Sequence, residues 1–496
     1  MTDVATKPQD VLAESNPHHE KRWWILLVLG LAQLMVVLDS TVVNIALPRA
    51  QADLGFSDGN RQWIITAYAL AFGSLLLIGG RISDVFGRKW TFIIGIVGFA
   101  IASALGGAAP NFEVLVTARA VQGAFGALLA PAALSLLTTT FTDMTERAKA
   151  FGIYGAIAGG GASVGLLLGG FLTEYADWRW CMYVNLIFAV IAGVGGFVLL
   201  RHNKAAERAR LDLPGTLLVT GGLFSLVYAF SHAETGGWAS SVTIGFFVAA
   251  AVLLVAFVYS QTKVAHPVLP LRVVLDRDRA GAFIAMFFAA VGMFGVFLFL
   301  TYYLQENLGY SPVKTGVAFL PMTGVIVLTA STVQTVLATR ISPKVMMPTC
   351  MLLAALALYL LTHIGVSSAY PSHVLPATIV MGFGLGLVFA PAFSLSTMGV
   401  AADDSGVASA MVNTMQQVGG SVGTALLNTI ATTAATTYIT SHGVSKASQA
   451  MGAVHSYTVA FWWSAGIFVL GAILAAVLLR PGVPQLDPNA EHVMGL

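Results

Sequence analysis

Long apolar runs separated by short polar segments dominate the hydropathy pattern of this 496-residue chain. A helix that crosses the hydrocarbon core of a bilayer needs about 20 apolar residues. The runs predict fourteen such helices, at residues 24–47, 62–80, 90–108, 113–137, 150–173, 180–200, 213–231, 240–261, 280–304, 313–338, 345–365, 373–399, 406–432 and 458–480. The pattern therefore predicts an all-α integral membrane protein.

The distribution of Lys and Arg between these helices predicts the orientation. With the N-terminus inside, cytoplasmic segments hold 19 of the 25 Lys and Arg residues and outer segments hold five, while Arg119 lies within a helix. Cytoplasmic loops carry an excess of these residues, so we expect both termini in the cytoplasm and a multi-pass protein of the cell membrane. The first 22 residues are polar, which argues against a cleavable signal peptide.

Composition agrees with this class of protein. Hydrophobic residues make up 57% of the chain and charged residues 10%, whereas soluble domains carry about 25% charged residues. The net charge of +2 arises from basic residues in short loops and gives no indication of nucleic-acid binding. The two cysteines, Cys181 and Cys350, are expected near opposite membrane surfaces, so we do not expect them to pair.

Two basic loops, at residues 201–212 and 262–279, divide the predicted helices into groups of six, two and six. The expected organisation is a cytoplasmic tail (1–22), a six-helix bundle (23–200), a two-helix insert with basic flanks (201–279), a second six-helix bundle (280–480) and a cytoplasmic tail (481–496). Three glycines of the fifth helix recur 254 residues later in the thirteenth: Gly152, Gly165 and Gly169 match Gly406, Gly419 and Gly423. This spacing indicates a parallel internal repeat, which is a transporter architecture.

One carboxylate, Asp39, interrupts the first apolar run. An ionisable group within a membrane helix by default marks a transport pathway or a proton relay. At 1.5 Å per residue, Asp39 lies about 13 Å below the outer end of its helix and Arg119 about 9 Å below the same surface. Burial favours the neutral form of a carboxylate, and a nearby guanidinium favours the charged form. We therefore predict a proton-coupling pair; the alternative is a static ion pair that fixes helix packing.

The turn between the second and third helices contains a charge cluster made of Gly80, Asp84, Gly87, Arg88 and Lys89. The residue Gly87 permits a tight turn, and Asp84 is suited to accept hydrogen bonds from Arg88 or from a helix N-terminus. We predict a conformational switch that holds the cytoplasmic face closed. The alternative is a basic anchor at the membrane surface.

The fifth helix carries Gly161, Gly165 and Gly169 at a spacing of four, which places them on one face. Small residues let a second helix approach closely. We predict that this face is the sliding contact between the two bundles; ordinary tight packing is the alternative.

Polar and aromatic residues near the helix centres and outer ends are candidates for a substrate cavity. They are Asn44, Tyr68, Gln122, Tyr302, Tyr303 and Gln305. For the tyrosines near the outer end, an aromatic belt at the membrane surface is the alternative explanation. The histidines are scattered, and neither a metal-ligand cluster nor a nucleophile–base pair is evident. We therefore expect neither an enzyme nor a metal site.

These stretches together resemble a known family. The segment Leu38–Pro48, the turn Gly80–Lys89, the sequence Arg119-x-x-Gln122-Gly123 and the glycine-rich fifth helix are similar to motifs of the major facilitator superfamily. With fourteen predicted spans, the chain resembles the drug:proton antiporter branch of the EmrB/QacA type. One position departs from the family pattern: Leu166 stands where the antiporter motif usually has proline.

The resemblance implies a transporter that exchanges protons for a hydrophobic or amphipathic small molecule by alternating access. The proton gradient would drive it, with no cofactor, and we expect it to function as a monomer in the lipid bilayer. An uptake symporter for a small amphipathic solute is the alternative from the same superfamily. A membrane-embedded enzyme and a non-transporting receptor fit the combination of Asp39, Arg119 and the cytoplasmic turn less well.

Overall fold

The computed structural model describes residues 19–56, 63–201, 212–330 and 340–482. Within these ranges every regular element is a helix. The first group comprises α2 (Arg22–Leu54), α4 (Trp63–Phe86), α5 (Arg88–Gly107), α6 (Phe112–Thr140), α7 (Met144–Tyr175) and α8 (Trp180–Leu199). Two further long helices follow, α9 (Leu213–Gly236) and α10 (Ser241–Gln261). The last group comprises α11 (Leu271–Leu275), α12 (Arg277–Tyr302), α13 (Pro312–Leu328), α15 (Pro343–Leu361), α16 (Leu375–Gly386), α17 (Phe389–Thr397), α18 (Ser405–His442) and α19 (Lys446–Leu478).

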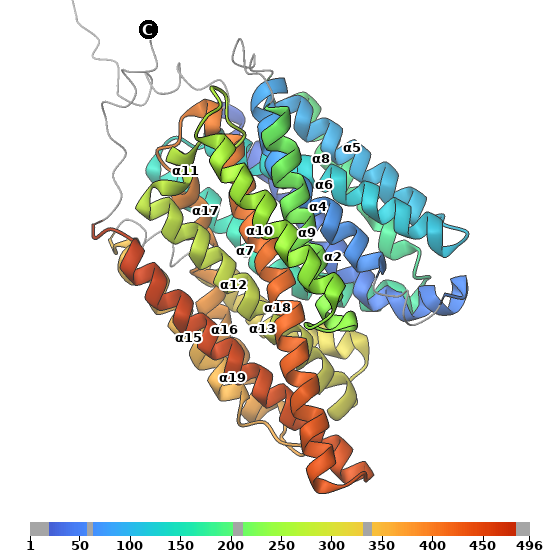
Figure 1. The fold of residues 1–496 in the computed structure, drawn as a ribbon. Helices are drawn as coiled ribbons and strands as arrows, with labels where there is room; N and C mark the ends of the chain where they lie inside the picture. Colours follow the sequence, from blue (N-terminus) through green and yellow to red (C-terminus); the bar gives the residue numbers. More distant parts are fainter. Residues whose placement is uncertain (1–18, 57–62, 202–211, 331–339, 483–496) are drawn as a thin grey trace, which may run out of the picture.

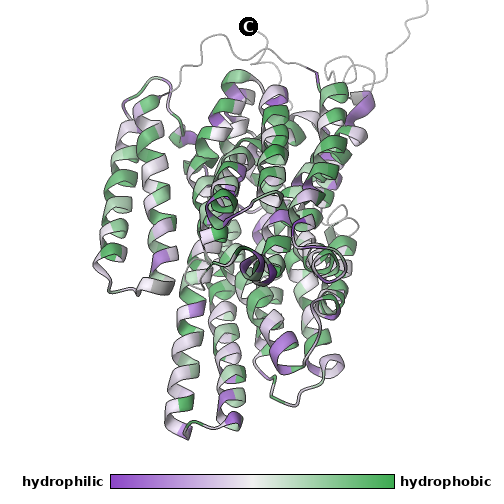
Figure 2. Cartoon of the chain, turned by 90° about the vertical axis from the view of Figure 1, so that its right-hand side faces the viewer, coloured by the Kyte–Doolittle hydropathy of each residue, from purple (hydrophilic) through white to green (hydrophobic). Residues whose placement is uncertain are grey.

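Twelve spans in the described residues are long and apolar enough to cross a membrane, with α16 and α17 belonging to one of them. The other two expected spans also coincide with helices. One is α13, which is apolar but has only 17 residues, and residues 331–339 of that expected span lie outside the described ranges. The other is α18, which is 38 residues long but is not among the twelve apolar spans. Figure 2 shows hydrophobic residues along most of the length of the helices.

Helices extend furthest beyond the hydropathy boundaries at three places. The helix α2 continues through Pro48 to Leu54, α18 continues to His442, and α19 begins at Lys446 rather than near residue 458. These extensions are more polar than the runs they continue, so the hydropathy signal ends before the helix does. A capping box at Ser445, in which its side chain accepts from the backbone of Ser448, fixes the start of α19. As a result α18 and α19 form a helical hairpin that projects beyond the neighbouring helices, in orange and red (Figure 1).

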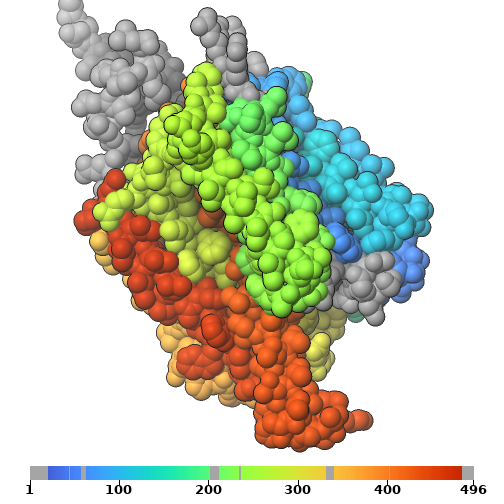
Figure 3. Space-filling model, viewed as in Figure 1, coloured from blue at the N-terminus to red at the C-terminus, as the bar shows by residue number. Residues whose placement is uncertain are grey.

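The helices form two bundles with α9 and α10 against their seam. In the first bundle α2 packs on α6, α7 and α8, and α4 and α5 pack on α6; in the second, α12 packs on α18 and α19, and α15 packs on α16 and α19. The main contacts between bundles are those of α7 with α13 and α17 and those of α18 with α4 and α6. The helix α9 touches α4 of the first bundle and α18 of the second. Figure 3 shows α9 and α10, in green, between the blue and orange surfaces.

The repeated glycines make equivalent contacts in the two bundles. The second and third glycine of each set face the first helix of their own bundle, which is α2 for one set and α12 for the other. The first glycine of each set faces the opposite bundle: a Cβ atom on Gly152 would overlap the carbonyl oxygen of Ala330, and one on Gly406 would overlap that of Gly80. The sequence repeat therefore corresponds to a repeat of packing.

Candidate functional site

An ion pair between Asp39 on α2 and Arg119 on α6 lies inside the first bundle. The guanidinium Nη1 of Arg119 donates to Asp39 Oδ2 at 2.6 Å, and both residues are 1% exposed. The expected pairing of the two charges is therefore present. Removing one partner of such a pair leaves an uncompensated buried charge, which costs about 3–5 kcal/mol.

Two side-chain amides complete the surroundings of the carboxylate. The Nε2 atom of Gln122 donates to Asp39 Oδ1 at 2.7 Å, and the Nδ2 atom of Asn185 donates to the same oxygen at 2.8 Å. Asp39 thus receives three side-chain hydrogen bonds from two helices, α6 and α8. Donors to a charged group form short and strong hydrogen bonds, so this arrangement suits the deprotonated carboxylate.

The guanidinium of Arg119 is also held from several sides. It donates to Gln122 Oε1 at 2.7 Å and to the carbonyl oxygen of Ile64 at 3.3 Å. Its central carbon lies 4.4 Å from the centre of the Tyr68 ring, a distance typical of a cation–π contact. The Tyr68 hydroxyl is buried and has no hydrogen-bond partner among the described residues.

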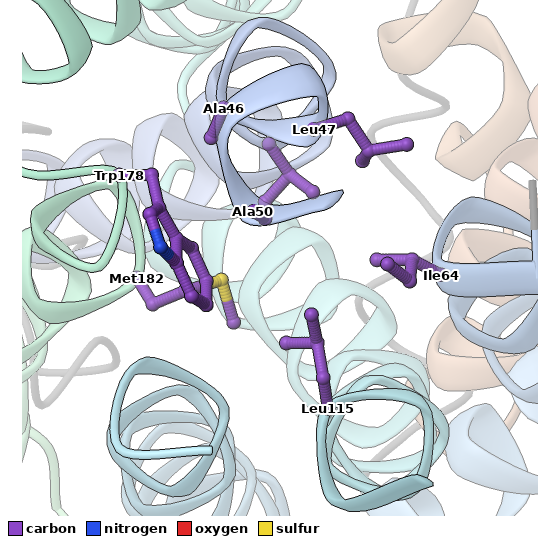
Figure 4. Close-up of a pocket in the computed structure, with 8 residues that line it drawn as sticks. Ala46, Leu47, Ala50, Ile64, Leu115, Trp178 and Met182 are labelled. Atoms are coloured by element: carbon purple, nitrogen blue, oxygen red, sulfur yellow. The ribbon is translucent and has the colours of Figure 1, made fainter. Parts of the chain in front are cut away.

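An apolar pocket lies one helical turn from the ion pair, toward the C-terminal end of α2. Its lining consists of Val43, Ala46, Leu47, Ala50, Ile64, Leu115, Trp178 and Met182, and Figure 4 shows these side chains turned toward one another. Val43 follows Asp39 by one turn on α2, and Leu115 precedes Arg119 by one turn on α6. The pocket therefore places apolar side chains between the ion pair and the end of the first bundle at which α2 ends and α6 begins.

At the end of α4, the turn that follows this helix reaches the second bundle through Asp84. Its Oδ1 accepts from the backbone N–H of Gly406 at 3.0 Å, and its Oδ2 accepts from that of Val407 at 3.2 Å. These N–H groups belong to the first turn of α18, where the helix dipole favours a negative charge. Arg88 Nη2 lies 3.9 Å from Asp84 Oδ1. The carboxylate therefore joins the two bundles where α4 ends and α18 begins.

Other members of the predicted switch have different positions. A Cβ atom on Gly80 would lie 2.5 Å from the carbonyl oxygen of Gly406, so Gly80 permits the close approach of α4 and α18. The residue Gly87 has a φ angle of 94° between α4 and α5, which favours glycine. The ammonium of Lys89 donates to the carbonyl oxygens of Phe197 and Leu200, so it caps α8 within the first bundle.

The glycine face of α7 requires a correction. The spacing of Gly161, Gly165 and Gly169 predicts a contact between bundles, but a Cβ atom on any of them would meet α2 of the same bundle. The contact with the second bundle lies on another face, where Gly155 and Gly159 approach Ala390 and Phe389 of α17. Spacing shows that residues share a face, but it does not show which neighbour covers that face. The helix α7 is continuous from Met144 to Tyr175, in keeping with Leu166 in place of proline.

A buried arginine adds a second connection between the bundles, where α7 begins and α17 ends, which the sequence pattern did not indicate. The Nη2 atom of Arg147, on α7, donates to Thr397 Oγ1 at 2.8 Å and to the carbonyl oxygen of Ser394 at 3.2 Å, both on α17. Its guanidinium also lies 4.8 Å from the centre of the Phe151 ring. Together with Asp84, it closes this end of the structure.

The candidates for the substrate cavity are divided between distant positions. The side chain of Asn44 lies outside what the structure describes. Tyr303 is fully buried, and its hydroxyl donates to the carbonyl oxygens of Gly365 and Ser368, whereas Tyr302 is 39% exposed. Gln305 is partly buried in the π-helix Tyr303–Asn307. Only Gln122 and Tyr68 contact the ion pair, and Gln122 does so as a partner of Asp39.

The residue most clearly missed is Asn185, which is fully buried and also donates to Ser103 Oγ at 3.0 Å. An amide side chain within the apolar run 180–200 is the signal that would have identified it. No group of three or more His, Cys, Asp or Glu side chains suited to a metal ion occurs in the part of the chain that the structure describes.

Comparisons with known proteins agree with this architecture. The family model described as Major Facilitator Superfamily matches residues 29–424. The puromycin resistance protein pur8 of Streptomyces alboniger is 50% identical over 491 residues, which cover 99% of this chain and 97% of that protein. The cephamycin export protein CmcT of Amycolatopsis lactamdurans is 34% identical over 469 residues, which cover 93% of each protein.

The fold also matches a solved structure, that of the human organic anion transporter MFSD10, with a TM-score of 0.62 over 92% of this chain and 99% of that one. The sequence identity there is 14%, so this match concerns the fold alone. The apolar spans and these relatives identify a multi-pass protein of the cell membrane. On this evidence the chain belongs to the Major Facilitator Superfamily of transporters.

Proposed function

We propose that this transporter exports a hydrophobic or amphipathic antibiotic in exchange for protons, by alternating access. The names of its relatives support export of this class of compound: they include a puromycin resistance protein, a cephamycin export protein, and a tetracenomycin C resistance and export protein. The proton coupling rests on the site itself and requires no cofactor besides the proton gradient.

The observation that carries the proposal is the enclosed ion pair of Asp39 and Arg119. In the arrangement observed, the carboxylate and the guanidinium neutralise each other away from water. A proton on Asp39 removes one of the two charges and leaves Arg119 buried without a counter-charge, which is unfavourable. Protonation therefore favours a different arrangement of the helices around Arg119. A proton and the present arrangement exclude each other, and that exclusion is the coupling that an antiporter needs.

The contacts of Asp84 and Arg147 support an assignment of the closed side. Both join the first bundle to the second at the cytoplasmic ends of α4, α7, α17 and α18. We propose that this arrangement is the cytoplasm-closed state, and that inward opening breaks these contacts. The proposal includes fourteen spanning helices, with α13 and α18 added to the twelve apolar spans, a six-plus-two-plus-six organisation, both termini in the cytoplasm and a functional monomer.

The test is transport in inverted membrane vesicles with an imposed pH gradient. Puromycin is the first compound to use, because the relative at 50% identity is a puromycin resistance protein. Wild-type vesicles are expected to accumulate the compound when their interior is acidic, and the variant Asp39→Asn is expected to lose this gradient-driven accumulation.

A matched control is Asp53→Asn on the same helix, since the Asp53 side chain is 50% exposed and pairs with Arg179 near the outer end. This variant should transport as the wild type does. Gradient-driven accumulation at the wild-type rate in Asp39→Asn would refute the coupling role. Accumulation driven by ATP without a pH gradient would refute the mechanism, and proton-dependent uptake into right-side-out vesicles would identify a symporter instead.

A further inference from the structure

The side-chain amides of Gln122 and Asn185 both donate to Asp39, but they differ in whether they can rotate by half a turn. The Oε1 atom of Gln122 accepts from Arg119, and a guanidinium only donates. Gln122 is therefore fixed with its nitrogen toward Asp39. In contrast, the Oδ1 atom of Asn185 is buried and has no hydrogen-bond partner in the described part of the chain. The Asn185 amide is therefore held in its present orientation through its nitrogen alone, by the hydrogen bonds to Asp39 and Ser103.

The hydrogen bond between Asn185 and its second partner, Ser103, can also reverse its direction. Its Nδ2 atom donates to Ser103 Oγ, and the Ser103 hydroxyl donates to the carbonyl oxygen of Met182 at 2.8 Å. A serine hydroxyl can both donate and accept. If the amide of Asn185 turns by half a rotation, its oxygen faces Asp39 and Ser103, and both are then able to donate to it, provided that Asp39 is protonated.

We propose that Asn185 is a positioning residue whose amide follows the protonation of Asp39, donating to the carboxylate and accepting from the carboxylic acid. The inference rests on the proposed function, in which Asp39 is the site of proton exchange. Arg119 and Gln122 can only donate to Asp39, whereas the Asn185 amide can donate to the carboxylate and accept from the carboxylic acid. A hydrogen bond to a charged group is the stronger of the two, so replacing Asn185 by an apolar residue should weaken the charged form of Asp39 more than the neutral form.

Few other titratable groups face Asp39 from the surrounding helices. Among the described residues, α6 contributes Arg119 and α4 contributes the Tyr68 phenol, whose ring lies under the guanidinium. The helix α5 presents Ser103, and α7 presents Gly165 beside Thr41 of α2. On α8 the nearest titratable group is Cys181, one turn outward of Asn185, and its thiol is hydrogen-bonded to Thr173. The effect of Asn185 on Asp39 is thus separable from that of Arg119.

The test is an infrared titration of the purified full chain in lipid nanodiscs, without transported compound. The carboxylic-acid band of Asp39 is identified by its absence in Asp39→Asn, and its midpoint is measured against pH. Asn185→Leu is expected to move the midpoint up by about one pH unit, equivalent to about 1.4 kcal/mol. The isosteric Asn185→Asp keeps the packing volume and places a second carboxylate beside Asp39. Its shift should be larger, since two adjacent carboxylates share one proton.

The variant Ser103→Ala is the control for a purely structural role. This variant removes the hydrogen bond between Ser103 on α5 and Asn185 on α8. It leaves the Asn185 amide that donates to Asp39, so it should not raise the midpoint of the Asp39 titration. The proposal is overturned if both Asn185 variants titrate as the wild type does, or if Ser103→Ala raises the midpoint as much as Asn185→Leu. This result is independent of the transport assay: an Asp39→Asn variant that still couples transport to protons refutes the proposed function, whatever the titration shows.

Discussion

Substitution of Gly406 by alanine tests whether the close approach of α4 and α18 belongs to one conformational state. A Cβ atom at Gly406 would overlap the carbonyl oxygen of Gly80 and would lie 2.6 Å from Asp84 Oδ1. The added methyl group meets the Gly80 backbone and the Asp84 carboxylate, which joins the bundles, and neither of these can move aside easily. We expect Gly406→Ala to disfavour the cytoplasm-closed arrangement.

The size of the effect follows from the packing. Inserting a methyl group into a filled contact costs about 1–3 kcal/mol. The gain in helix propensity from glycine to alanine, about 1 kcal/mol, applies to both states and cancels. If the clash exists only in the closed state, the equilibrium moves toward inward opening by about 5–150-fold.

Double electron–electron resonance between the cytoplasmic ends of the bundles measures this shift. Spin labels at Thr145 and Leu275 report on the distance, since both side chains are exposed. Thr145 lies at the start of α7, and Leu275 is the last residue of α11, just before α12. Cys181 and Cys350, which are both buried free cysteines, are replaced by alanine in all samples. Gly406→Ala should increase the population at long distance.

The matched control is Gly420→Ala, on the same helix, where an added Cβ atom meets nothing within 4 Å. It should leave the distance distribution unchanged. Equal distributions for wild type, Gly406→Ala and Gly420→Ala would show that this contact does not distinguish the two states, and the reasoning would then be wrong.

Three further predictions concern the same framework. Asp84→Asn replaces the charge that faces the N-terminus of α18 by a neutral amide, which should weaken the closed state by about 1–3 kcal/mol. The expected readout is a longer distance between the same spin labels. Arg147→Gln breaks the hydrogen bonds to α17 and should also lengthen the distance between the spin labels. An unchanged distance would show that these hydrogen bonds do not hold the closed state. Gly165→Ala crowds Thr41 of α2 within one bundle, so thermal unfolding should occur at a lower temperature. The spin-label distances should stay as in the wild type. A shifted distance distribution would contradict the conclusion that this face of α7 packs within its own bundle.

Several features were predictable from the sequence because they depend on quantities that act along one helix. Membrane thickness sets the length of an apolar run, so the fourteen expected stretches all overlap described helices. The rise per residue sets depth, so Asp39 and Arg119 were expected at the same level, and they form an ion pair. The glycine repeat predicted that the two bundles are built alike, and the repeated glycines make equivalent contacts in both.

Other features depend on how the helices turn about their axes, which no local pattern specifies. Gly161, Gly165 and Gly169 share a face by spacing, but only the packed structure shows that α2 of the same bundle covers it. Likewise, Asn185 is 146 residues from Asp39 along the chain, and their hydrogen bond exists because α8 packs beside α2. The sequence by itself determined where the long apolar helices lie and that Asp39 falls within one of them. The tertiary structure alone decided which side chains surround that charge, because helix rotation and neighbour choice result from packing of the whole bundle.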